Sequence, residues 1–306
     1  MPNTFHVAAR AIGSALSGLL LLNCSGLPST TGRSETRAVS AASGPLKSAA
    51  SSFNVRHRGQ SGIRPIRSGP EALAARVVLA AAATRAVDAQ YYIWHEDASG
   101  RRLACALLRA ADRGVRVRLL LDDLGSSAKD ENLLLLNRHE NIEVRLFNPI
   151  TNRSAKMLGM LADFGRVNHR MHNKVFVADN QLAVVGGRNI GDEYFAADEA
   201  MNFADFDVLA AGPVVGELSQ SFDSFWNSPL TINIADLAGV RQAAYDSFNR
   251  LRHQLEDRVK SDAADARLEG HSKAIASEIR GGLQSFVAAR AKAVGDYPGK
   301  ASGTSK

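Results

Sequence analysis

A histidine and a lysine separated by one residue, His172 and Lys174, are the side chains of this sequence best suited to chemistry. We place both in a Val- and Phe-rich strand, where alternate residues project from the same face of a sheet. An imidazole can attack phosphorus, and an ammonium group beside it can hold the phosphoryl oxygens and neutralise the charge that develops on them. The pair therefore predicts a nucleophile next to a phosphate clamp.

Three further residues extend this pattern. Asp179 has the opposite strand parity, so it can join the pair only where the strand ends and turns. Residues 179–181 favour such a turn, with residues 182–185 returning as a paired strand. Asn189 follows a Gly-Gly pair and can add a neutral donor to the same phosphoryl oxygens; we count Gly187 with it as substrate-binding.

The order H-x-K, four residues, D, and then G-G-x-N resembles the phospholipase D superfamily. Further blocks are similar to its bacterial cardiolipin synthase branch, and they lie at 89–94, 115–123, 143–149 and 185–195. The resemblance runs from about residue 61 to residue 228. It implies catalytic roles for His172, Lys174 and Asp179, with Asp179 orienting a histidine or balancing its charge. Lipases, lipid synthases and nucleases share the motif, so it does not select a substrate.

Several neighbouring residues carry two interpretations each. His169 has the other strand parity from His172, which favours an ordinary packed or surface histidine over one that orients the site. Tyr91, Tyr92 and Trp94 end a predicted strand, where pocket residues gather, although aromatic residues there are more often core. Asp122 and Asp123 close another strand, and a helix-capping role and a site role are equally open for them.

Composition favours an anionic partner without choosing one. The 306 residues include 37 Lys and Arg against 31 Asp and Glu, which gives a net charge of +6 and suits acidic phospholipid or nucleic acid. The two cysteines, Cys24 and Cys105, make no disulfide framework, and Cys105 reads as core. Neither a CxxC pair nor a metal-spaced His and carboxylate cluster occurs, so we expect no metal and no cofactor.

The N-terminal region predicts export. Arg10 precedes an apolar run over 12–22 that is short for a membrane span but right for a signal peptide, which we assign to residues 1–24. The end of this run resembles a bacterial lipoprotein cleavage site with Cys24 as the lipidated residue, although Asn23 departs from that pattern. Residues 25–60 are rich in Ser, Thr, Gly and Arg and predict a disordered tether. We therefore expect a protein associated with a membrane of the bacterial cell envelope.

Helix and strand patterns alternate beyond the tether. Helices are predicted at 70–83, 101–113, 128–138 and 213–226, and strands at 87–94, 115–121, 142–147 and 206–210. This alternation predicts an α/β fold, a mixed sheet flanked by helices on both faces. The resemblance implies the same fold, one phospholipase D-like half-domain over residues 61–230 with its motif segment at 166–193.

Residues 231–306 predict a helical C-terminal extension. Apolar residues recur every three or four positions from Leu237 to Val259, as in an amphipathic helix. A weaker pattern of the same kind predicts a second helix that crosses Gly281-Gly282 and extends to Val287. The tail from residue 299 is polar and expected to fray.

The chain departs from the cardiolipin synthases in carrying one H-x-K-D set where they carry two, one histidine attacking phosphorus and the other protonating the leaving alkoxide. Either two copies meet as a homodimer, or the chain is a truncated relative. The leading hypothesis is a phosphatidyltransferase or phospholipase that acts on phospholipid through a phosphohistidine. A nuclease of the same mechanism, or an inactive half-domain serving as a membrane-bound interaction protein, are the alternatives.

Overall fold

The computed structural model describes residues 27–126, 129–150, 153, 168–196, 203, 205–237, 245–261 and 266–299. Within them, nine strands form one sheet in the order β8-β4-β3-β2-β5-β6-β7-β1-β9. The strands are β1 (Ser61–Ile66), β2 (Ala86–Tyr91), β3 (Arg116–Asp122), β4 (Ile142–Phe147), β5 (Val175–Ala178), β6 (Leu182–Gly186), β7 (Asp207–Ala211), β8 (Thr231–Asn233) and β9 (Val287–Ala289). Strands β2, β3 and β4 pair in parallel and the other pairings are antiparallel, so the predicted mixed sheet is confirmed.

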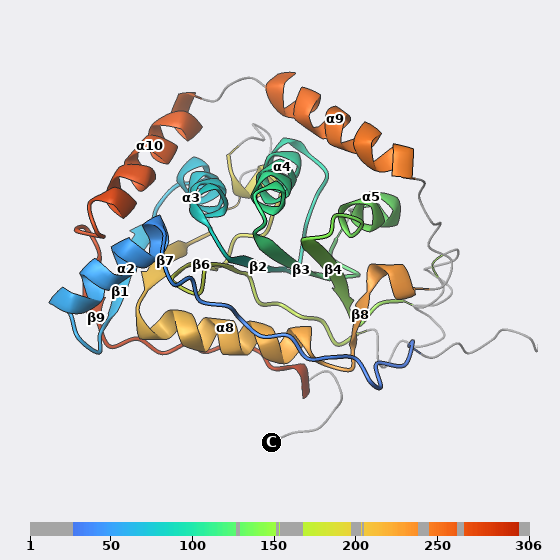
Figure 1. Cartoon of the computed structure of the whole chain (residues 1–306), viewed down its shortest axis with the longest axis horizontal. Coiled ribbons are helices and arrows are strands. Elements are labelled where there is room, and N and C mark those ends of the chain that lie inside the picture. Colours follow the sequence, from blue (N-terminus) through green and yellow to red (C-terminus); the bar gives the residue numbers. More distant parts are fainter. Residues whose placement is uncertain are drawn as a thin grey trace, which may run out of the picture.

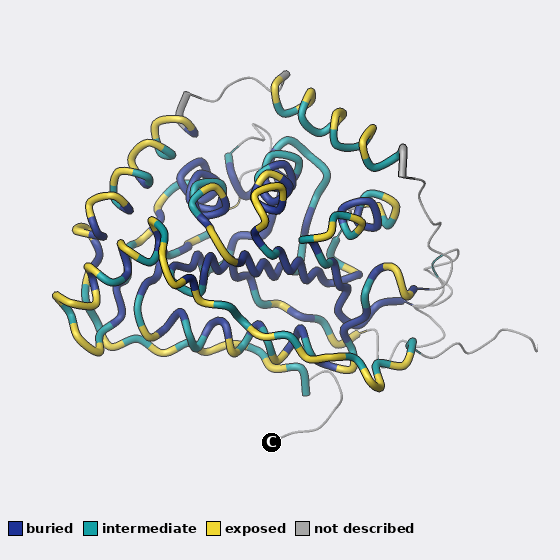
Figure 2. Tube along the Cα trace, viewed as in Figure 1, coloured by how far each residue is buried: buried dark blue, intermediate teal, exposed yellow. Residues whose placement is uncertain are grey.

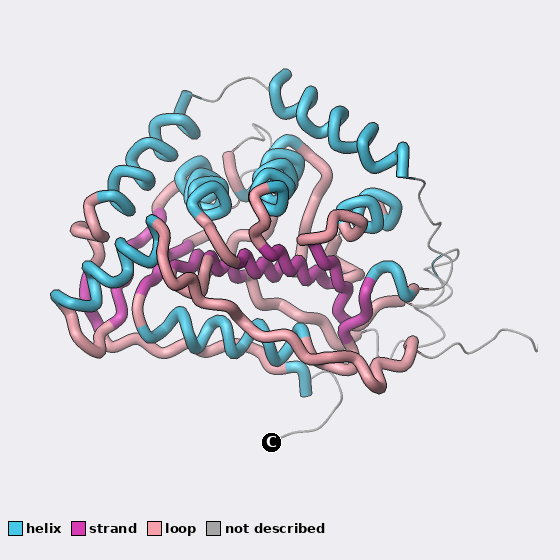
Figure 3. The backbone as a smooth tube through the Cα atoms, in the orientation of Figure 1, coloured by secondary structure: helices cyan, strands magenta, loops and turns pink. Residues whose placement is uncertain are grey.

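Helices cover both faces of this sheet, as predicted (Figure 1). They are α2 (Pro45–Arg56), α3 (Gly69–Ala82), α4 (Ala98–Asp112), α5 (Asp130–Leu136), α8 (Pro213–Trp226), α9 (Tyr245–Ser261) and α10 (Ala266–Arg280), with the short 3-10 helices η2 (Asp192–Tyr194) and η3 (Ile234–Asp236). Helices α3, α4 and α5 lie on one face and α8 lies on the other (Figure 3). Helices α9 and α10 form an outer layer, where α9 packs on α4 and α10 packs on α3.

Two apolar cores lie on opposite sides of the sheet, so the strands between them are buried on both faces. One core gathers the apolar faces of α3, α4 and α5 with those of the strands, and the other joins the sheet to Phe222 and Trp226 of α8. In Figure 2 the sheet is accordingly the continuous buried layer at the centre. Burial on both faces explains the nearly unbroken apolar sequence of the central strands.

Local signals explain where the core helices start and stop. Helix α3 begins after Ser68, whose hydroxyl accepts the N–H of Glu71 while the Glu71 carboxylate accepts the N–H of Arg67. Helix α4 begins after Asp97, whose carboxylate accepts the N–H of Gly100. Gly114 then takes the left-handed conformation, with φ of 86°, and ends this unit as the sequence predicts.

The N-terminal segment differs from the expected disordered tether. Residues 45–56 form helix α2, which buries Leu46 and Phe53 completely. Residues 27–44 have little regular structure, but they lie along the α8 face of the molecule (Figure 1). The expectation of disorder is therefore wrong for the described residues 27–60. The sparse apolar residues of this stretch suffice because they enter pockets that the rest of the fold provides.

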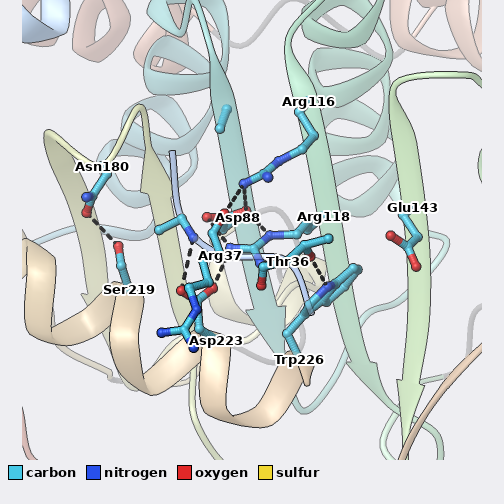
Figure 4. A network of polar contacts seen from close by, with 12 residues as sticks. Thr36, Arg37, Asp88, Arg116, Arg118, Glu143, Asn180, Ser219, Asp223 and Trp226 are labelled. Atoms are coloured by element: carbon cyan, nitrogen blue, oxygen red, sulfur yellow. Dashed lines mark hydrogen bonds and ion pairs between the residues drawn. The ribbon is translucent and has the colours of Figure 1, made fainter. Parts of the chain in front are cut away.

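A buried polar network fixes this segment at Thr36 (Figure 4). The Thr36 carbonyl accepts a hydrogen bond from the Arg118 guanidinium at 2.9 Å, and its hydroxyl accepts the indole N–H of Trp226 at 2.8 Å. Arg118 is itself paired with Asp88 and with Asp223, at 2.6 Å and 2.7 Å. Because Arg118 is buried, these partners offset the cost of removing its charge from water.

The C-terminal region also differs from a purely helical extension. Strand β8 pairs with β4 at one edge of the sheet, and β9 pairs with β1 at the other. The second predicted helix ends at Arg280, and Val287, which was expected to continue it, begins β9. Gly282, at φ of 75°, makes the break. The residues after 230 therefore complete the same sheet as well as adding helices α9 and α10.

Candidate active site

His172 and Lys174 lie in the segment that leads into β5, which begins one residue after Lys174. They therefore precede the strand in which the sequence placed them. Their side chains nevertheless meet: the Nζ of Lys174 lies 3.1 Å from the Nδ1 of His172 and donates to the His172 carbonyl at 2.8 Å. His172 is exposed, whereas Lys174 is only 7% exposed. The pair thus presents an accessible imidazole beside a nearly buried cation.

The surroundings of this pair favour a neutral imidazole. Although the His172 side chain is exposed, its ring loses part of its contact with water. This partial burial and then the Lys174 ammonium lower the pKa of His172 below its usual value, and Asp296 opposes them. Burial also lowers the pKa of Lys174, against the opposing charges of Asp205 and Asp296. A charged ammonium can only donate, so Nδ1 accepts and the ring proton of a neutral His172 sits on Nε2. Nε2 can attack only after Lys174 turns to a substrate phosphate and the proton moves to Nδ1.

Tyr92 forms one side of the site. Its ring lies 5.1 Å from the His172 ring, and the Nζ of Lys174 lies 5.7 Å from the centre of the Tyr92 ring. Tyr91 and Trp94, by contrast, are buried in the core. The site interpretation therefore holds for Tyr92, and the core interpretation holds for Tyr91 and Trp94.

Asp122, at the end of β3, holds the backbone that enters the site. One oxygen of its carboxylate accepts the N–H of Met171 and the other accepts the N–H of Leu124, each at 3.0 Å. Burial raises the pKa of Asp122 to about 6, although Arg170 and the backbone donors oppose this shift. Asp123 turns away and accepts the N–H of Ile150. Asp122 thus supports the site by fixing the residue before His172.

The Gly-Gly pair is required by a close approach of two carboxylates. A Cβ on Gly186 would lie 2.2 Å from an oxygen of Asp207, and a Cβ on Gly187 would lie 2.3 Å from an oxygen of Asp205. Either contact is far inside van der Waals distance, so a larger residue would displace Asp207 at the start of β7 or the side chain of Asp205 before it. Asp205, whose charge acts on Lys174, is a site residue that the sequence reasoning missed.

Asn189 is bound inside the protein more firmly than expected of a phosphate ligand. Its Oδ1 accepts the N–H of Ile93 at 3.0 Å, its Nδ2 donates to the Tyr194 hydroxyl at 3.1 Å, and the residue is 4% exposed. One amide N–H is left beyond these two bonds. Asn189 therefore joins the segment after β2 to the Gly-Gly loop.

Asp179 does not lie with His172 and Lys174. It follows β5 at the opposite end of the strand, and its carboxylate accepts the backbone N–H groups of Thr84, Arg85 and Ala86 at 2.7–3.1 Å. The residue is completely buried. The expectation that Asp179 orients or charge-balances a histidine is therefore wrong: its oxygens hold the entry to β2 in place.

A segment near the C-terminus lies against the site from the other side. The side-chain amide of Asn173 donates to the carbonyl of Asp296 at 3.3 Å and accepts the N–H of Asp296 at 3.2 Å. Asn173 stands between His172 and Lys174 in the sequence, so this contact brings residues 293–296 to the site. Sequence spacing held no signal for it, because 123 residues separate the two partners.

Two other sequence predictions fall elsewhere. Cys105 is buried, as predicted for a core residue, whereas Cys24 and the signal segment lie outside the described residues. Among the described helices, none combines the length and the apolar character that a bilayer crossing needs.

Comparisons with known proteins show which sequences and folds the chain resembles. Residues 78–226 match the family described as "Cardiolipin synthase, PLD-like domain". The chain is 52% identical over 170 residues to cardiolipin synthase C of Escherichia coli (strain K12), a match that covers 56% of this chain and 36% of that protein. It is 43% identical over 203 residues to an uncharacterized protein of Helicobacter pylori (strain J99), covering 66% of this chain and 40% of that one. NucT from Helicobacter pylori, a solved structure, is 15% identical with a TM-score of 0.42, covering 56% of this chain and 98% of its own. The chain thus spans less than half the length of these two sequence relatives.

Proposed function

Because this chain belongs to the phospholipase D superfamily, we propose that it cleaves or transfers glycerophospholipid phosphodiesters through a phosphohistidine on His172, as a cardiolipin synthase-like enzyme. The observation that carries the proposal is the contact of 3.1 Å between the Lys174 ammonium and the exposed His172 ring. It places a nucleophile and the counter-ion of its target in one open site.

In the first step the Nε2 of His172 forms a bond to phosphorus while the bond from phosphorus to the head-group oxygen breaks. Lys174 leaves Nδ1 and binds one non-bridging oxygen, the remaining N–H of Asn189 binds the other, and Asp205 or Asp296 balances the added positive charge. The backbone N–H of Gly187 already donates to the carbonyl of Phe206 at 3.0 Å, so we propose that Gly187 acts only by leaving room for the substrate. The leaving oxygen needs a proton from the opposite side of phosphorus, which His172 cannot reach. In the second step an alcohol or water releases the phosphatidyl group.

We propose that the proton donor is the His172 of a second copy, so that the active form is a homodimer with two His172 side chains facing each other. Activity should then fall on dilution as dimers dissociate, in step with the dimer fraction found by sedimentation. Full activity in a demonstrably monomeric sample would show that another residue supplies the proton.

A nuclease of the same mechanism is the second candidate, favoured by the single motif and the net charge of +6. The test is to offer the purified protein phospholipid vesicles and DNA separately, with His172→Ala as the control. Phosphatidic acid or cardiolipin that is absent with the variant supports the proposal, and nicked DNA alone supports the nuclease. No product from either substrate would favour an inactive, membrane-bound interaction protein.

Membrane attachment is proposed through Cys24 after export, which would bring the site to its lipid substrate. Mass spectrometry of the mature protein should find a lipidated N-terminal Cys24, and Cys24→Ser should leave the protein unlipidated. A mature start at any other residue would overturn this part of the proposal alone.

A further inference from the structure

The chain carries its excess positive charge in one stretch near the N-terminus. Residues 27–68 hold seven Lys and Arg against one Glu, which leaves 30 of each sign in the rest of the chain. The stretch comprises the segment 27–44, helix α2 and strand β1, and its first part is the blue layer that passes over α8 in Figure 1. Charge of one sign gathered in so short a stretch produces a local field that attracts anions.

The fold brings this charge to the Asp179 end of β5. Ala41 donates its N–H to the Asp179 carbonyl at 3.1 Å, which fixes the N-terminal segment to this end of the sheet. The carbonyl of Arg37 accepts a hydrogen bond from Arg116 at the start of β3. Arg85 donates its backbone N–H to the Asp179 carboxylate and leaves its side chain exposed. Three arginines from different parts of the sequence therefore lie at one edge of the sheet.

Two further cations belong to the same edge. Lys47 of α2 and Arg58, which follows α2, line an open hollow beside the turn that joins β5 to β6. The exposed carboxylate of Glu35 lies here as well and pairs with Arg37 at 3.2 Å, so it offsets one of these charges. We call the five cations the basic edge: Arg37, Lys47, Arg58, Arg85 and Arg116.

The basic edge is separate from the proposed nucleophile. His172 precedes β5 and Asp179 follows it, so seven residues of extended chain, roughly 20 Å, lie between them. That distance is more than twice the Debye length of about 8 Å at physiological ionic strength, so salt screens the basic edge from a phosphate at His172. The basic edge therefore has a role other than holding the phosphate that His172 attacks.

The chain that leads into the basic edge favours a bilayer as its partner. Leu27 packs against the core, so the segment 27–44 is docked from its start and is not a slack linker. The proposed attachment point, Cys24, lies three residues earlier, and three residues of extended chain span about 10 Å. A bilayer attached there lies about one Debye length from the docked segment. Over that range Lys and Arg side chains are attracted to acidic phospholipid.

Nucleic acid is the other anionic partner, and the basic edge lacks one feature that binds it. Proteins that bind single strands stack the bases on exposed aromatic rings. Residues 27–68 contain one Phe and no Tyr or Trp, and that residue, Phe53, is completely buried.

We propose that the basic edge docks on the surface of a bilayer rich in acidic phospholipid and leaves the exposed imidazole of His172 uncovered at the other end of β5. One lipid chain alone holds a protein only marginally, and a basic surface beside the chain adds a second contact. The choice of a bilayer rests on the proposed membrane attachment. Docking by the basic edge itself requires neither a lipidated Cys24 nor chemistry at His172.

The test is vesicle binding by the full chain with Cys24→Ser, the parent protein, so that charge acts without a lipid anchor. The protein is sedimented with vesicles of phosphatidylglycerol and phosphatidylcholine, or of phosphatidylcholine alone. The triple variant Lys47→Glu, Arg58→Glu and Arg85→Glu should bind the acidic vesicles roughly 100-fold or more weakly, because three attractive charges become repulsive. Within the described part of the chain these three side chains have no hydrogen-bond or ion-pair partner, so the melting temperature should hold.

The matched control reverses three exposed cations on α9, in the outer layer over α4: Arg250, Arg258 and Lys260. It changes the net charge by the same amount, so its binding should stay close to that of the parent. An equal loss in both triple variants would show that net charge acts and not the basic edge. Unchanged binding by the basic-edge variant would also overturn the proposal.

A DNA duplex added as competitor separates the two anionic partners. Vesicle binding that persists when DNA supplies as many phosphates as the acidic lipid supports the bilayer. DNA that displaces the parent protein from the vesicles, and that the basic-edge variant no longer binds, would assign the edge to nucleic acid and overturn the proposal.

Turnover of a short-chain phosphatidylglycerol, dissolved as monomers, separates docking from chemistry. The basic-edge variant should match the parent, because its changes lie at the far end of β5 from His172. A loss of turnover at an unchanged melting temperature would place the basic edge in the catalytic surface and contradict the inference. If no sample shows turnover, the proposed function fails, and the vesicle measurement still decides the docking.

Discussion

The two ends of β5 divide between them a motif that reads as one unit in the sequence. At the first end, His172 and Lys174 contact each other, and His172 is exposed. At the other end, Asp179 is completely buried and its oxygens accept three successive backbone N–H groups. The first end keeps side chains that a substrate can contact. At the second end, the charge of Asp179 serves only to bind the backbone. The spacing of the motif therefore reflects two different tasks, chemistry and anchoring.

Removing the nucleophile should have the largest effect. His172→Ala is expected to lower turnover roughly 10⁴-fold or more, since the covalent step has no substitute. The melting temperature should hold, because the His172 side chain is exposed. His253→Ala, which removes another exposed histidine on α9, is the control and should leave both turnover and melting temperature unchanged. Near-normal turnover by the purified His172→Ala protein would show that His172 is not the nucleophile.

Asp179→Ala should show the opposite profile. The variant leaves the backbone N–H groups of Thr84, Arg85 and Ala86 without their acceptor, which should cost about 3 kcal/mol or more of unfolding free energy. Urea unfolding measures this loss. Turnover per folded molecule should stay close to that of the wild type. A variant as stable as the wild type but inactive would show that Asp179 takes part in catalysis, and would contradict the difference proposed between the two ends of β5.

Lys174→Met should change the titration of His172. In the wild type, the pKa of His172 lies below its ordinary value of 6.5, partly because of the adjacent ammonium. Removing that charge should raise the pKa of His172, which NMR titration of the labelled ring can follow. Since only the neutral ring attacks, wild-type kcat/KM should fall as the pH drops through this lowered value. A His172 pKa that Lys174→Met leaves unmoved would mean that the two groups are not coupled in solution.

The smallest effect expected is that of Asp296→Asn. Asp296 is the weakest of the three influences on the pKa of His172 and the one that raises it, so its neutralisation should lower the pKa further. The backbone contacts of Asp296 with Asn173 do not involve the changed carboxylate and should persist. An upward shift in the same NMR titration would contradict the placement of residues 293–296 beside the site.

Sequence reasoning succeeded where a signal is local and failed where it is not. The predicted helix over 213–226 has the bounds of α8, and the contact of His172 with Lys174 follows from their spacing. Asp179 was misassigned because seven residues of extended chain, roughly 20 Å, separate it from His172. The order of the motif residues in the sequence does not show that they lie at opposite ends of the same strand.

The other misses share one cause, which is partners that lie far apart in the sequence. Asp205 and Asp296 reach the site through a loop and through a segment that returns after β9. Strand β9 has three residues and depends on pairing with β1. Helix α2 has too few apolar residues for its sequence pattern to predict a helix. Its Phe53 nevertheless fills a pocket that α3 and α10 help to build. Such elements are decided by tertiary contacts, which a pattern along one chain does not contain.

The central claim is that the open end of β5 carries a covalent phosphohistidine on His172. The direct measurement is to incubate the protein with a short-chain phosphatidylglycerol, denature it rapidly at alkaline pH, where phosphohistidine survives, and locate any phosphatidyl adduct by peptide mass spectrometry. The account predicts an adduct on the peptide that contains His172 and none in His172→Ala. Turnover without any adduct on that peptide, or with the adduct on another residue, would contradict it.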